Sequence, residues 1–131
     1  MKHFIDAVVA VTGTAVCWLF GAWDLPIIAL LCFMAADYLT GVILAVVNKR
    51  LSSEVGFKGL AKKAVILLVI VLAVFLDRLI GGETWTFRTL TAWFYLANEG
   101  ISLLENAAAL GVPVPKKLKD VLAQLKDKDK E

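Results

Sequence analysis

The sequence predicts an all-α membrane protein with about four transmembrane helices, three being the alternative, and a short amphipathic helix near the C-terminus. Hydrophobic residues make up 60% of the 131 residues, whereas a soluble domain of this size is usually nearer half apolar. Mean hydropathy is +0.77, and the apolar residues form runs long enough to cross the roughly 30 Å core of a bilayer as helices. The net charge of +2 indicates no particular partner.

The first expected span covers residues 4–23. Its start resembles a secretory signal peptide, but Asp6 interrupts the apolar run and more hydrophobic segments follow, so we expect a retained span. Three small residues, Gly13, Cys17 and Gly21, recur at every fourth position. Small residues at this spacing let two helices approach closely in lipid, so we interpret them as helix-packing residues.

The second expected span covers residues 26–47 and begins with Pro26, which the first turn of a helix accepts because no N–H is needed there. Asp37 falls near the middle of the span, and Gly41 and Ala45 follow at one-turn intervals. An acid inside a membrane is costly and is usually paired or functional. We therefore expect the face with Asp37 and the small residues to pack on protein rather than on lipid.

A polar loop is expected over residues 48–63, because it contains two glycines and five basic residues against one acid. The third expected span, residues 64–80, is almost entirely Val, Ile, Leu and Ala up to Asp77 and Arg78. Those two residues lie near the far end, where they can reach the interface, and we expect them to form a local pair at the membrane edge.

The fourth expected span, residues 89–110, is the most polar of the four. We expect it to end before Pro113, because proline cannot continue a helix. On a helical wheel its polar residues form one band, which we call the polar stripe: Tyr95, Asn98, Glu99, Ser102, Glu105 and Asn106. Such a helix is too polar to face lipid all round. Either the polar stripe is buried between helices of one chain, or it lies between copies of the chain and lines water. The other spans offer only Asp37 at a similar depth, so we expect little charge within the chain to pair with the polar stripe.

The placement of lysines predicts the topology. Nearly all of them lie in residues 48–63 and in the tail, and short loops rich in Lys and Arg stay in the cytoplasm. Four spans with both termini in the cytoplasm satisfy this rule, giving a membrane domain over residues 1–112 and a Lys-rich cytoplasmic tail over 113–131. If residues 89–110 do not cross, three spans remain and the tail lies outside. Within the tail, residues 115–126 have the apolar spacing of an amphipathic helix at the membrane surface, and the last residues, 127–131, are expected to be disordered.

The sequence offers no motif for catalysis or for a cofactor. His3 is the only histidine, and no Cys/His spacing indicates a metal. Both cysteines lie in apolar runs and are expected to be small buried residues. The lysines suit lipid headgroups better than nucleic acid. We therefore expect neither an enzyme nor a nucleic-acid partner.

Three stretches of the chain together resemble the toxin-secretion/phage-lysis holin family of Gram-positive bacteria and their phages. They are residues 37–41 (DYLTG), 52–63 (SSEVGFKGLAKK), and 98–106 (NEGISLLEN) with 111–115 (GVPVP). The second stretch holds the family-motif residues of the expected loop: Ser52, Ser53, Gly56, Lys58, Gly59, Lys62 and Lys63. The resemblance covers roughly residues 25–125, in an order and spacing similar to the family's.

This resemblance implies a holin. Such a protein accumulates in the bacterial cytoplasmic membrane, forms homo-oligomers among the lipids, and opens lesions that release an endolysin or a toxin, leading to host cell lysis or secretion. An antiholin is a further implied partner. The polar stripe would then be pore-lining or lie between subunits. Two alternatives stay open: a small ion or solute channel or transporter with Asp37 as an ion site, and an antiholin-like regulatory subunit that opens nothing by itself.

Overall fold

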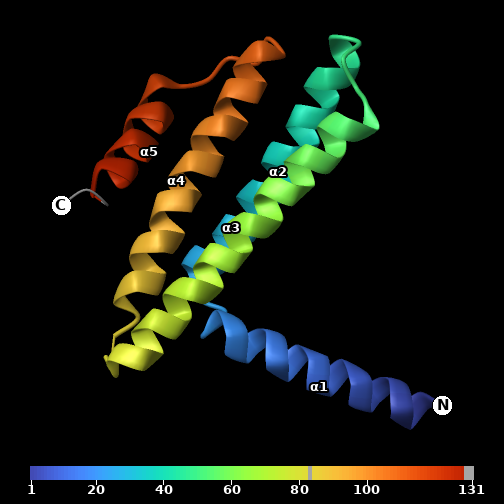
Figure 1. The fold of residues 1–131 in the computed structure, drawn as a ribbon. Coiled ribbons are helices and arrows are strands. Elements are labelled where there is room, and N and C mark those ends of the chain that lie inside the picture. Colours follow the sequence, from blue (N-terminus) through green and yellow to red (C-terminus); the bar gives the residue numbers. More distant parts are fainter. Residues whose placement is uncertain (83, 129–131) are drawn as a thin grey trace.

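A computed structural model describes residues 1–82 and 84–128 (Figure 1), and the side chains of residues 125–128 are left undescribed. The protein is all-α, as predicted. Its helices are α1 Lys2–Phe20, α2 Leu25–Val47, α3 Ser53–Ile80, α4 Thr86–Ala109 and α5 Lys116–Lys128. Among the described residues, α1, α2 and α3 are the helices both long enough and apolar enough to cross a membrane by composition.

Helices α2, α3 and α4 form the centre of the molecule (Figure 1). Successive short connections make α3 antiparallel to α2 and α4, and the closest packing is between α2 and α4. Aliphatic side chains fill the space between the three helices because each helix turns one apolar face inward. The buried core consists of Ile27, Leu30, Met34, Ile70, Ala92 and Leu96.

Helix α1 points away from this bundle (Figure 1), and the rest of the described chain buries none of its residues. It meets the bundle near its C-terminus, where the ring of Trp18 packs edge-on against Phe75 at 5.4 Å. The guanidinium of Arg78 lies 4.3 Å from the centre of the Trp18 ring and donates to the Trp18 carbonyl. Most of the apolar surface of α1 is thus free to contact lipid.

Helix α3 begins at Ser53, so the loop expected over residues 48–63 is wrong for most of its length. The hydroxyl of Ser52 caps the helix by accepting from the backbone N of Val55 at 3.2 Å. Gly56 and Gly59 belong to the helix, where they face Tyr38: a Cβ at either glycine would lie 3.4 Å from that side chain. These glycines bring α3 close to α2 rather than break it.

Asp77 of α3 is buried at 4% exposure, and its side chain caps the start of α4. Its carboxylate accepts from the backbone N of Phe87 and of Arg88, at 2.9 Å each, and so satisfies donors that the first turn of α4 would otherwise leave unpaired. The local pair expected between Asp77 and Arg78 is therefore wrong, since Arg78 turns instead toward the rings of Trp18 and Trp85.

Helix α5 is present where an amphipathic helix was predicted, but it folds back along α4 (Figure 1). A Cβ at Gly100 would lie 3.0 Å from both methyl groups of Leu122 and 3.3 Å from the ring of Phe33. The absence of a side chain at Gly100 therefore makes room for Leu122. Residues 127 and 128, expected to be disordered, end α5, and residues 129–131 lie outside the described residues.

Candidate functional site

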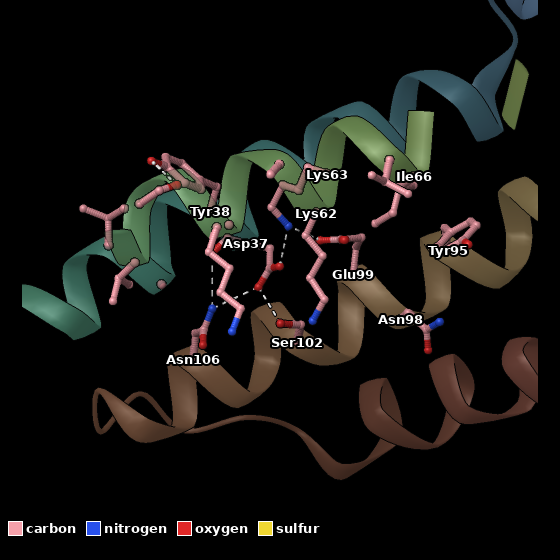
Figure 2. Close-up of a pocket in the computed structure, with 18 of the residues that line it drawn as sticks. Asp37, Tyr38, Lys62, Lys63, Ile66, Tyr95, Asn98, Glu99, Ser102 and Asn106 are labelled. Atoms are coloured by element: carbon pink, nitrogen blue, oxygen red, sulfur yellow. Dashed lines mark hydrogen bonds and ion pairs between the residues drawn. The ribbon is translucent and has the colours of Figure 1, made fainter. Parts of the chain in front are cut away.

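One lysine links the three central helices (Figure 2). Lys63 of α3 donates from Nζ to Oδ2 of Asp37 on α2 and to Oε2 of Glu99 on α4, at 2.7 Å each. The side chains of Lys63, Asp37 and Glu99 are 14%, 12% and 8% exposed. Breaking so buried an ion pair is costly, because the remaining charge loses both its partner and its water.

Two polar side chains of α4 complete the hydrogen bonding of Asp37. Ser102 donates to Oδ1 at 2.6 Å, and Asn106 donates to the same oxygen at 3.0 Å. Asn106 also lies 3.0 Å from the hydroxyl of Thr40. We call Asp37, Lys63, Glu99, Ser102 and Asn106 the polar network. Asp37 thus faces protein rather than lipid.

The small residues beside Asp37 lie on the same side of α2. A Cβ at Gly41 would lie 3.7 Å from the Asn106 amide nitrogen, so the absence of a side chain there keeps the approach to α4 open. Ala45, one turn further, is half-buried.

The structure divides the polar stripe. Glu99, Ser102 and Asn106 point into the polar network, whereas the side chain of Asn98 points away from it (Figure 2) and Glu105 is exposed.

Tyr95 is half-buried and packs edge-on against Phe94 at 5.1 Å. The expectation that the polar stripe has little charge to pair with in its own chain is wrong, because Lys63 supplies it. This partner was missed because Lys63 was expected to lie in a loop, although its position directly before the apolar run of residues 64–80 was a usable signal.

The small residues of α1 are less engaged within the chain. A Cβ at Gly13 would meet no other described residue within 4 Å, while Gly21 lies against Arg88 and Trp85. The cysteines are exposed rather than buried as expected, and Cys17 accepts from the indole N–H of Trp23 at 3.0 Å. A packing role for Gly13 and Cys17 stays a prediction for contacts beyond this chain.

A second polar cluster lies at the other end of the bundle, where sequence reasoning missed it. Arg88, 1% exposed, holds both carboxylate oxygens of Asp24 at 2.9 and 3.1 Å. Its remaining donors reach the carbonyls of Phe20, at 2.6 Å, and Ala22. The hydrogen bond from Arg88 lowers the pKa of Asp24 below its usual range. Arg88 therefore ties the start of α4 to the turn between α1 and α2.

A cavity of about 930 Å³ opens beside the polar network, between α2, α3 and α4. The family-motif residues lie along it: Gly56, Lys58, Gly59, Lys62 and Lys63 are among its lining. Ser52 and Ser53 are exposed at the start of α3. Within residues 1–82 and 84–128, no group of three or more His, Cys, Asp or Glu is placed to hold a metal ion.

Comparison with known proteins gives a family for this arrangement. The model of the bacteriophage holin family matches residues 14–127. An uncharacterized 14.9 kDa protein from the nagH 3' region of Clostridium perfringens is 58% identical over 88% of either chain. The uncharacterized protein YtkC of Bacillus subtilis is 32% identical over 96% of this chain and 93% of its own. No solved structure matches the chain.

Proposed function

Since this chain belongs to the bacteriophage holin family, we propose that it assembles with copies of itself in a bacterial cytoplasmic membrane and opens lesions there. The cargo would be a folded cell-wall hydrolase or a toxin. Family membership and three long apolar helices make it a holin-like membrane protein, and the family is one of non-enzymatic membrane proteins. The lesion, its cargo and the assembly of copies are the proposal.

The observation that carries the proposal is the polar network buried between the three central helices. Apolar side chains of the same length often stabilise a core as well as a buried ion pair does. A network of two acids, a lysine, a hydroxyl and an amide therefore suggests a second state in which these groups meet water. The resting bundle keeps them paired, so a single copy can sit in lipid without a pore.

In the proposed open state, α4 separates from α2 and α3, and the polar stripe turns toward other copies. Tyr95, Asn98 and Glu105, which do not join the polar network, would then line the lumen with Glu99, Ser102 and Asn106. Separation in lipid leaves buried charges without partners, which is strongly unfavourable. It becomes tolerable when several copies enclose water together, so opening should depend steeply on the amount of protein in the membrane. Gly13 and Cys17 on α1 offer a close-packing surface for such copies.

We further propose four spans with both termini in the cytoplasm. Helix α4 runs beside α2. Its first turn contacts Asp24, just before α2, through Arg88, and its last turn contacts Asp37, in the middle of α2, through Asn106. If α2 crosses the membrane, α4 crosses with it, and its polar stripe is shielded by α2 and α3. This accounts for a spanning helix that hydropathy alone does not select. The Lys-rich tail after residue 112 would then lie on the cytoplasmic side.

The test is expression in a bacterial host together with a folded cell-wall hydrolase, with membrane potential and hydrolase activity outside the membrane measured over time. The proposal predicts sudden depolarisation and release of the hydrolase together. Intact membranes at high expression contradict it. Ion flux without release would identify a small channel or transporter, and an effect only beside a partner protein would identify an antiholin-like subunit.

A further inference from the structure

Helices α2 and α3 place the membrane boundary at different heights. Beyond Asp37, α2 is mainly apolar to its end and exposes Leu39 at 60% and Ile43 at 50%. Beside this segment runs the first part of α3, since Tyr38 bonds to the carbonyl of Gly56 at 3.4 Å. That part of α3 carries lysines, which avoid hydrocarbon, whereas the neighbouring turns of α2 avoid water. A bilayer meeting this end of the bundle must satisfy both.

The cavity lies where the apolar turns of α2 face the lysine-bearing first part of α3. Apolar side chains form much of its wall, among them Val42, Val55 and Ile66, and Lys58 and Lys62 also line it. Figure 2 shows the side chain of Lys62 reaching from α3 toward Ser102 on α4. The volume of the cavity, about 930 Å³, is in the range of cavities that hold small organic ligands.

The charges of the cavity are not balanced. Its acids, Asp37 and Glu99, share Lys63, and neither Lys58 nor Lys62 forms an ion pair within the described part of the chain. Three lysines against two acids leave one net positive charge, next to an apolar wall. This combination fits a ligand that is anionic at one end and apolar along the rest.

We propose that the cavity binds one anionic phospholipid of the cytoplasmic leaflet. Its phosphate would lie between Lys58 and Lys62, and an acyl chain would lie along Val42 and Val55. The headgroup then supplies the counter-charge that the lysines need, and the chain covers the apolar turns of α2. A free phosphate would satisfy the lysines but leave the apolar wall uncovered. The inference rests on the membrane orientation given under the proposed function, but not on lesion formation.

The experiment is native mass spectrometry of the full chain released from detergent, with phosphatidylglycerol or phosphatidylcholine of identical acyl chains. We expect phosphatidylglycerol to remain bound and to be lost about tenfold more readily from the Lys58→Gln/Lys62→Gln variant. The matched control, Lys116→Gln/Lys117→Gln, removes the same charge from α5 and should retain the lipid. Lys58→Arg/Lys62→Arg should also retain it, which separates loss of the site from loss of folding.

Three results would overturn the proposal. Equal retention of phosphatidylglycerol in the two glutamine variants would show that the lysines of the cavity are not the site. Equal binding of phosphatidylcholine would show that the anionic headgroup is not recognised. Displacement of the lipid by inorganic phosphate at the same concentration would assign the lysines to a free anion. Because the readout is lipid binding, a protein that opens no lesion can still pass or fail this test.

Discussion

Lys63 of α3 lies 2.7 Å from a carboxylate oxygen of Asp37 on α2 and 2.7 Å from one of Glu99 on α4. A single cation therefore joins the three helices of the central bundle and bridges the two acids. The state of this contact should set both the stability of the resting bundle and the ease with which α4 leaves it.

Replacing Lys63 by methionine should destabilise the bundle and advance lysis. The substitution leaves Asp37 and Glu99 facing each other without a cation, and losing one partner of a buried pair typically costs about 3–5 kcal/mol. Thermal unfolding in detergent measures the first effect, and the time of hydrolase release measures the second. Lys116→Met is the matched control, since Lys116 on α5 is exposed, lies outside the cavity and makes no ion pair among the described residues. A Lys63→Met protein that unfolds like the control would refute a holding role for Lys63.

Glu99 and Glu105 should differ in what they affect. Glu99→Leu removes a partner of Lys63 and should change both the unfolding temperature and the time of lysis. Glu105 is exposed in the resting bundle, so Glu105→Leu should leave the unfolding temperature almost unchanged and alter only lysis timing. Release curves and unfolding curves of the two variants check this. Unchanged timing in both would limit the polar stripe to packing.

The ion pair of Asp24 and Arg88 should stabilise the folded protein at neutral pH, and this contribution to the free energy of unfolding should be lost only at acidic pH. Because the pKa of Asp24 in the folded protein lies below the usual value of an aspartate, about 3.9, its contribution is fully present above that usual value and is lost as the pH falls through the lowered pKa. The difference in unfolding free energy between the wild type and Asp24→Asn should thus be constant above about pH 5 and shrink below about pH 4. It should be modest, since the Asp24 side chain is 43% exposed. A difference that grows as the pH falls would contradict this.

Filling the space at Gly100 should release α5 from α4. A leucine there would overlap Leu122, whose methyl groups lie 3.0 Å from the position of a Cβ. We expect trypsin to cleave the tail of Gly100→Leu several-fold faster than that of the wild type. Gly13→Leu serves as the control, because a Cβ at Gly13 meets no described residue within 4 Å. Equal cleavage of both variants would show that Gly100 does not hold α5.

Much of the fold could be predicted from the sequence because hydropathy and proline placement mark spans directly. The helix over residues 26–47 and the amphipathic helix of the tail both lie within a few residues of the expected bounds. The start of α3 was missed because glycines in a polar stretch are typical of loops, whereas Gly56 and Gly59 instead make room for Tyr38. This role of the two glycines becomes visible only when α2, which carries Tyr38, is placed beside α3.

For the candidate site, the sequence predicts the residues of α4 that share a face but not their partners on the other helices. Periodicity identifies which residues of α4 share a face, so Glu99, Ser102 and Asn106 were correctly grouped with one another on the helix. It does not show which residue of another helix reaches that face, so the ion pairs of Lys63 were missed. Arg88 and Asp24 were missed for the same reason: they are 64 positions apart, and the sequence alone does not show that their helix ends meet.

The central claim, that the polar network is closed within the resting bundle and meets water in the lesion, is tested most directly at Ser102. The measurement is labelling of Ser102→Cys by a membrane-impermeant thiol reagent, with Cys17 and Cys32 replaced by alanine, before and after the onset of hydrolase release. Leu68→Cys, on the exposed apolar surface of α3, is the lipid-facing control and should stay unlabelled. The account predicts that Ser102→Cys is protected before onset and labelled after it. Protection that persists while the hydrolase is being released would contradict it.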